Sequence, residues 1–292
     1  MRISKSFIIA ASMLLNISFA TSQSYLPHSD GEVVRHTYYT LSYIEEHEQA
    51  EWVAYEMTPR NAESNVTRND SFKADPKVST ASALPTDYQG SGYDRGHLCP
   101  AASMSFDKVA MEESFYMSNM SPQAPTFNRD GWMRLEKLVR GWAAADSVIY
   151  VVTGPILSNP KGSLKRGGVT IPSSYYKVVF SPRKGEMIGF VMPNDKIGKA
   201  LEGYAVTIDE VEAQTGIDLF AGGDFDKEEA TIDLSAWSFT TTKTKTQTTD
   251  ANTSATRVDP PQCKGVTTKG KQCRNTTTNA NGYCHLHQSQ AE

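Results

Sequence analysis

The feature that most constrains the fold is a threonine-rich stretch near the end of the chain. Residues 240–261, TTTKTKTQTTDANTSATRVDPP, contain almost no apolar side chains. Such a stretch cannot bury a hydrophobic core, so it is predicted to be an exposed linker. It separates a body at 31–237 from a short tail at 262–292. Only the body has the length and composition of a sizeable folded domain.

The N-terminus predicts export. Arg2 and Lys5 precede an apolar run over 7–15, and small residues lead to Ala20. This order is typical of a secretory signal peptide, here residues 1–20. The apolar run is too short to span a bilayer, and no cysteine follows it closely enough to carry a lipid. We therefore expect a secreted or periplasmic protein without a membrane anchor.

The overall charge gives no sign of a nucleic-acid partner. The chain of 292 residues has a net charge of −4 and a pI near 5.9. Any contact with nucleic acid must therefore come from a local basic patch. The four cysteines are too few for a disulfide-rich scaffold, although export would permit disulfides. Cys99 is predicted to be a buried structural thiol.

Hydrophobic patterns in the body predict a mixed α/β domain built on an antiparallel sheet. Runs rich in β-branched and aromatic residues predict strands, and apolar residues at helical spacing predict helices. The segment at 207–220 also begins with a capping-box pattern, Thr207 to Glu210. The predicted strands are 36–44, 51–60, 147–156, 175–181 and 186–193, and the predicted helices are 106–115, 128–146 and one that begins at Thr207 and stops at Gly216.

The segment GSGYDRGHLCPAA, residues 90–102, contains the best candidate for a catalytic base. His97 is the natural choice, because only imidazole titrates near neutral pH without perturbation. Gly96 before it permits a backbone turn. Arg95 and Arg60 carry planar donor groups that suit phosphate oxygens. The alternative is a turn with a surface ion pair and no chemistry.

Asn128 and Glu136 offer oxygen atoms of the kind that Mg²⁺ prefers. Eight residues along a helix turn by about 80° and rise by about 12 Å. Both side chains can therefore face one cavity, but they are not expected to touch the same ion. Asn128 would bind the metal, and Glu136 would hold its water ligands. The alternatives are that Asn128 only caps a helix and that Glu136 is solvated.

Together these segments resemble the DNA/RNA non-specific endonuclease family, the ββα-metal nucleases. The resemblance rests on the signature at Gly90–His97 and on SNMSPQ, which contains Asn119. It also rests on the asparagine at 128, which leads through Trp132 to Glu136. It covers roughly residues 35 to 225. The fold it implies is α+β, a ββα-metal core with a central antiparallel sheet flanked by helices.

The resemblance also implies roles for individual residues. His97 is similar to the general base that activates water, and Asn128 to the only direct protein ligand of Mg²⁺, for which Mn²⁺ can substitute. Glu136 is similar to the residue that orients the metal-bound water. Two further residues, Arg60 and Arg95, are similar to the cations that steady the phosphate.

Asp94 and Asn119 are similar to the family's supporting residues, which shape the site. The activity implied is hydrolysis of phosphodiester bonds in DNA and RNA with little sequence specificity. Two other functions stay open. One is a non-catalytic protein of the same fold that binds nucleic acid or a cell surface, and the other is a phosphodiesterase for small esters. The sequence leaves the oligomeric state open.

The tail predicts a small zinc module. Its three cysteines and a histidine follow the spacing C-x9-C-x10-C-x2-H, and such a set can close a tetrahedral zinc site. His285 is a competing ligand, and a disulfide between two of the three thiols is the alternative. The predicted ligands are Cys263, Cys273, Cys284 and His287.

Overall fold

The computed structural model describes residues 25–198, 200–221, 230–240, 261–266, 271–273, 281–283 and 290. The chain forms two compact units, residues 1–242 and 243–292. The predicted signal peptide, almost all of the predicted linker, and Cys284, His285 and His287 of the tail lie outside the described residues.

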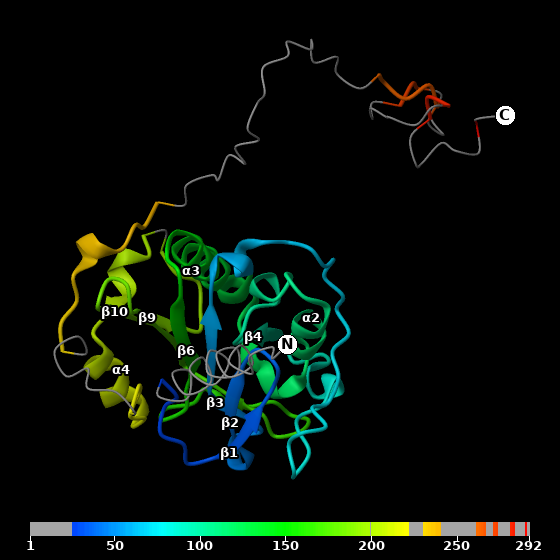
Figure 1. Cartoon of the computed structure of the whole chain (residues 1–292). Helices are drawn as coiled ribbons and strands as arrows, with labels where there is room; N and C mark the ends of the chain where they lie inside the picture. The colour runs from blue at the N-terminus through cyan, green and yellow to red at the C-terminus, as the bar shows by residue number, and fades with distance from the viewer. Residues whose placement is uncertain are drawn as a thin grey trace, which may run out of the picture. The chain divides into compact units, whose positions relative to one another are not determined.

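The first unit is built on a seven-stranded antiparallel sheet (Figure 1). The strands predicted from the sequence are confirmed, and two edge strands, β1 and β11, join them. Their order across the sheet is β1-β2-β3-β6-β9-β10-β11. The bounds are β1 Glu32–Arg35, β2 Thr40–Ile44, β3 Gln49–Met57, β6 Ile149–Ile156, β9 Ser174–Ser181, β10 Glu186–Pro193 and β11 Ala205–Val206.

Helices cover both faces of this sheet, because successive side chains of a strand point to opposite sides. On one face, Leu135, Leu138 and Trp142 of α3 (Met133–Ala145) join the larger core. On the other, Ile208 and Val211 of α4 (Ile208–Thr215) join the smaller core. Figure 1 places α4 on one side of the labelled strands, and α2 and β4 on the other.

Helix α4 begins and ends as its sequence predicts. The Thr207 hydroxyl accepts from the Glu210 amide at 3.2 Å, and the Glu210 carboxylate accepts from the Thr207 amide at 3.1 Å. This is the predicted capping box. The helix stops at Gly216, which adopts the left-handed conformation with φ 75°.

Two strands that the sequence does not predict form a separate two-stranded sheet. They are β4 (Asp94–His97) and β5 (Met120–Gln123), which pair antiparallel. The segment around His97 is therefore a strand and not a turn. Gly96 is required here by a close approach, since a Cβ at this position would lie 2.2 Å from the Gln123 side chain. Each strand has only four residues and a polar sequence, so neither gives a clear hydrophobic pattern.

The helix predicted at 128–146 is confirmed from Met133 onward, but it is preceded by a wider turn. Phe127–Trp132 form a π-helical turn, η7, that runs directly into α3. The predicted helix at 106–115 is α2 (Lys108–Ser114), whose first amides are capped by the Asp107 carboxylate. The short elements that remain are η2 Glu45–His47, η3 Pro59–Ala62, η4 Pro85–Tyr88, η5 Ala101–Ser103, η6 Met117–Asn119, β7 Gly162–Ser163, β8 Thr170–Ile171, η8 Glu202–Tyr204 and η9 Leu234–Ala236.

In the second unit, the described residues place two of the tail cysteines in a small buried cluster, Cys263 with Cys273. A single bridge between Val266 and Gln272 brings these segments together. In the described part of the chain, no helix is long and apolar enough to cross a membrane.

Candidate active site

His97 ends β4, and its ring is enclosed by aromatic side chains. The ring of Phe115 meets it edge-on with centroids 4.9 Å apart, and that of Phe72 lies at 5.9 Å. The residue is only 8% exposed, and its buried Nε2 has no hydrogen-bond partner among the described residues. Burial, aided by the nearby Arg68 guanidinium, lowers the pKa of His97 to about 3. The ring is therefore neutral at pH 7 and able to accept a proton.

The backbone on both sides of His97 is fixed. The Trp132 indole donates to the His97 carbonyl at 3.2 Å, so the start of α3 is tied to β4. Asn119 holds the chain two residues further on. Its side chain accepts from the Cys99 amide at 2.8 Å and donates to the Cys99 carbonyl at 2.9 Å. Its amide group also donates to the Ser114 carbonyl, so all three hydrogen bonds of this fully buried side chain go to the backbone. Asn119 therefore supports the site and does not face it.

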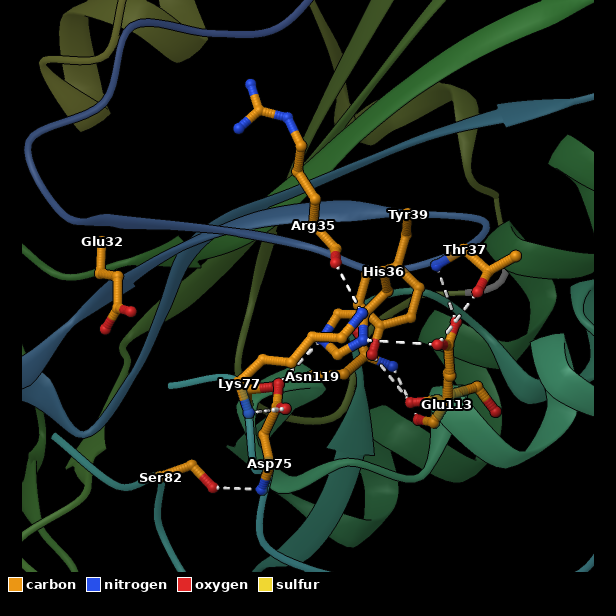
Figure 2. Close-up of polar contacts among 12 residues, drawn as sticks. Glu32, Arg35, His36, Thr37, Tyr39, Asp75, Lys77, Ser82, Glu113 and Asn119 are labelled. Carbon is orange, nitrogen blue, oxygen red and sulfur yellow. Dashed lines mark hydrogen bonds and ion pairs between the residues drawn. The ribbon is translucent and has the colours of Figure 1, made fainter. Parts of the chain in front are cut away.

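Figure 2 shows a polar cluster near Asn119, buried around Asp75 and more exposed around Glu113. The Asp75 carboxylate accepts from His36 Nε2 at 2.8 Å and from the Ser118 hydroxyl at 2.5 Å. The Glu113 carboxylate accepts from the amide and the hydroxyl of Thr37. These bonds link the hairpin β1–β2 to α2 and to the residue before Asn119. The cluster thus fixes the frame on which β4 and β5 are built.

Replacing Asp75 by asparagine should destabilise the fold by about 1–3 kcal/mol at pH 7, because the hydrogen bonds to a charged acceptor are weakened. Although burial acts to raise the pKa of Asp75, the hydrogen bonds from His36, Ser118 and the Lys77 amide lower it below the ordinary value. The stability it provides is present above the unfolded pKa and is lost as the pH falls through the folded one.

Urea unfolding at pH 7, 5 and 3 measures this contribution. The wild type should lose more stability than Asp75→Asn on going from pH 5 to pH 3. Equal losses in both proteins would contradict the assigned role.

Asp94, at the other end of β4, orients Asn128. Its carboxylate accepts from Asn128 Nδ2 at 3.0 Å and from Arg129 at 2.6 and 2.8 Å. A carboxylate can only accept, so the amide nitrogen of Asn128 must face Asp94 and its Oδ1 is turned away. Asn128 does not cap a helix, because it lies inside the π-helical turn η7, Phe127–Trp132, that runs into α3. A surface ion pair does form here, between Asp94 and Arg129. It exists beside the hydrogen bond from Asn128 to Asp94, so it does not change the orientation of the Asn128 amide.

Glu136 lies on α3, one turn after Trp132, and is only partly exposed to solvent. Burial raises the pKa of Glu136, while three cations, Lys177, Arg140 and Arg68, act to lower it. Arg68 also acts on His97, so this one guanidinium is within electrostatic reach of both groups. The geometric link between His97 and Glu136 is Trp132, which precedes Glu136 by one turn and donates to the His97 carbonyl.

The two predicted phosphate-binding arginines differ in their surroundings. The guanidinium carbon of Arg95 lies 4.1 Å from the centroid of Phe72, the ring that also borders His97. Arg60 lies over Phe106 at 4.5 Å and 3.8 Å from Asp107, and its side chain is 53% exposed. No contact in the described residues brings Arg60 to His97. Arg60 instead lines a cavity of about 750 Å³ at the end of the hairpin β1–β2.

The sequence prediction missed three cations. Arg140 follows Glu136 by four residues, so helical spacing could have revealed it. Lys177 is a single charge inside the apolar run YYKVVF, which is itself a signal. Arg68 lies in the long loop after η3, where no pattern marks it.

Cys99 is buried as predicted. Burial raises the pKa of its thiol far above the usual range, so a thiolate nucleophile is disfavoured at this position.

The residues present fit a hydrated divalent cation. Among the described residues, no group of three or more His, Cys, Asp or Glu side chains could hold a metal ion. An amide oxygen on Asn128, oriented by Asp94, is the kind of single ligand that Mg²⁺ accepts when water fills most of its shell. Glu136 supplies a carboxylate for that water.

Comparison with known proteins assigns this chain to a class. The family model described as DNA/RNA non-specific endonuclease matches residues 18–226. The nuclease of Serratia marcescens is 38% identical over 208 residues, which cover 66% of the chain and 76% of that protein. Nuclease C1 of Cunninghamella echinulata var. echinulata is 35% identical over 201 residues, covering 62% and 80%.

A crystal structure of an EndoG/EndoGI complex superposes with a TM-score of 0.65 at 29% identity. It covers 72% of this chain and 93% of the matched one. The fold is thus that of the ββα-metal nucleases, as predicted, and the class of protein is a nuclease. The chain belongs to the DNA/RNA non-specific endonuclease family.

Proposed function

We propose that the protein is a secreted or periplasmic, Mg²⁺-dependent endonuclease that hydrolyses DNA and RNA with little sequence specificity. The observation that carries the proposal is the neutral, buried His97, whose Nε2 has no partner among the described residues. It lies on the same short strand as Asp94, which orients the Asn128 amide. A neutral imidazole with an open acceptor and an oriented oxygen ligand, on elements that are joined, suit hydrolysis of a phosphodiester.

In this mechanism His97 takes a proton from the attacking water. Arg95, which lies over the Phe72 ring beside His97, donates to the phosphate oxygens, where its fixed charge offsets the negative charge of the ester. Asn128 would hold the Mg²⁺, or Mn²⁺ in its place, and Glu136 would accept hydrogen bonds from its water. When bound, the cation supplies Lewis-acid stabilisation of the charge that develops on phosphorus and on the leaving 3′ oxygen.

The same residues account for the low sequence specificity proposed. Guanidinium groups and a divalent cation recognise phosphates, which are alike at every step of a nucleic acid. The products should carry 5′-phosphate and 3′-hydroxyl ends. Export rests on the apolar N-terminal segment at 1–20.

The direct test incubates the purified protein with plasmid DNA and with RNA, in Mg²⁺ or in excess chelator. Degradation of both polymers in Mg²⁺ alone is the expected result. Intact polymer in every tube would favour a non-catalytic binding protein. Hydrolysis of a chromogenic phosphodiester without loss of polymer would favour an enzyme for small esters.

For the tail we propose a zinc site formed by Cys263, Cys273, Cys284 and His287. Its support is that Cys263 and Cys273 are buried together and that the Gly265 amide donates to the Cys263 sulfur at 3.3 Å. Amide donors of this kind stabilise thiolate ligands.

Elemental analysis of full-length protein, purified without added zinc, should find about one zinc ion per chain. The Cys273→Ser variant should lose most of that zinc. A zinc-free wild type that resists thiol alkylation would instead identify the disulfide.

A further inference from the structure

A lysine lies in the middle of the central sheet, where water does not reach it. Lys177 is on β9, between β6 and β10, and is 0% exposed. Alternation along the strand points it to the face covered by α3, together with Tyr175 and Val179. A charge in such a place is costly unless opposite charge and polar contacts offset the lost hydration. Nothing in the mechanism above uses this residue.

The contacts of Lys177 link strand β3 to Trp132, the residue directly before α3. Its ammonium donates to the Tyr55 hydroxyl at 3.2 Å, on the neighbouring strand β3. The same nitrogen lies 4.7 Å from the centroid of the Trp132 ring, within cation–π range. Trp132 in turn donates to the His97 carbonyl. One buried cation thus supports the indole that fixes the backbone of the catalytic base.

Glu136 is the acidic residue that acts most strongly on Lys177. It follows Trp132 by four residues, so the two side chains project from the same side of the helix start. Among the charges that act on Glu136, Lys177 gives the largest attraction, and Glu136 gives the largest attraction on Lys177. Burial lowers the pKa of Lys177 only to about 8, because Glu136 acts to raise it. The opposite charges of Lys177 and Glu136 therefore attract through space, without a direct ion pair among the described residues, and Lys177 is the buried member of the two.

We propose that Lys177 is a positioning residue of the nuclease centre, the buried counter-charge of Glu136 and the support of the Trp132 indole behind His97. The role rests on the proposed function, since it acts on the two groups that activate and hold water there. A lysine that served the core alone would be replaceable by an apolar side chain of similar length without loss of catalysis.

The test compares Lys177→Met with Lys184→Met in the full-length protein. Lys184 is a matched control, because its ammonium also lies over a tryptophan, Trp237 at 4.2 Å, and also faces a carboxylate, Asp146 at 3.5 Å. Thermal unfolding, kcat and KM on plasmid DNA, and Mn²⁺ affinity by electron paramagnetic resonance without nucleic acid are measured for both.

We expect Lys177→Met to stay folded, to lose about 10- to 100-fold in kcat with KM nearly unchanged, and to bind Mn²⁺ about tenfold more weakly. Lys184→Met should match the wild type in kcat and Mn²⁺ affinity. A folded Lys177→Met protein with kcat and Mn²⁺ affinity within twofold of the wild type would overturn the proposal.

A double-mutant cycle with Glu136→Gln covers the case in which Lys177→Met alone does not fold. The double variant buries neither charge, so it should fold and bind Mn²⁺ as Glu136→Gln alone does. A double variant that binds Mn²⁺ more weakly than Glu136→Gln alone, or that also fails to fold, would show that Lys177 serves the core. If the wild type cleaves nothing, the proposed function fails, while the unfolding and Mn²⁺ measurements still decide the role of Lys177.

Discussion

Replacing His97 by alanine should lower the rate of DNA and RNA cleavage by about 10²- to 10⁴-fold, the usual worth of a general base. The expected reason is that, among the described residues that form the site, His97 is the only imidazole with an open ring nitrogen. Initial rates on plasmid DNA at saturating Mg²⁺ measure the effect. His28→Ala is the matched control, because that side chain is 70% exposed and belongs to no part of the site.

The His97→Ala substitution should also change how the free energy of unfolding depends on pH. Burial and Arg68 lower the pKa of His97 to about 3 in the folded state. The unfolded chain therefore binds an additional proton between the ordinary histidine pKa, about 6.5, and that value. Wild-type stability should fall across this window as the pH is lowered, and His97→Ala should be spared this part of the fall. Near-normal cleavage by a folded His97→Ala protein would remove His97 from the mechanism.

Asn128→Ala should cost at least about 10²-fold in cleavage, because it deletes the only proposed direct ligand of the cation. Excess Mn²⁺ should recover little of the loss, since no other side chain in the described residues replaces the amide oxygen. Titration of activity with Mg²⁺ and with Mn²⁺ provides the measurement.

Arg129→Ala is the control for this variant. It also removes a hydrogen-bond donor to Asp94, but it leaves the Asn128 oxygen in place. Cleavage by Asn128→Ala at the level of Arg129→Ala would mean that the Asp94 cluster, and not a metal ligand, explains the effect.

The central sheet and its helices follow from the sequence, because their apolar patterns are long. β6, β9 and β10 are eight residues each and have a neighbouring strand on both sides, and α4 carries its own capping signals. The pair β4 and β5 was not predictable in this way. Each strand is four residues long, and it forms because it pairs with the other strand, which is distant in the sequence. The local sequence pattern does not indicate it.

The site was predicted as a set of residue types and only partly as an arrangement. Sequence motifs located His97, Asn128 and Glu136, but the orientation of the Asn128 amide depends on Asp94, which lies 34 residues earlier in the chain. Asn119 bonds to the backbone of Cys99, and Lys177 is buried beneath α3. Both arrangements depend on contacts between residues far apart in the sequence. Long-range contacts of this sort leave no periodic trace in the sequence.

The most direct measurement is a crystal structure of the His97→Ala variant with a short DNA duplex and Mn²⁺, in which anomalous scattering locates the ion. The account predicts one Mn²⁺ bound to Asn128 Oδ1 at about 2.1 Å, in contact with the scissile phosphate and otherwise surrounded by water. Residue 97 should lie on the opposite side of that phosphate. An ion held elsewhere, with the Asn128 oxygen turned away from the phosphate, would contradict the account.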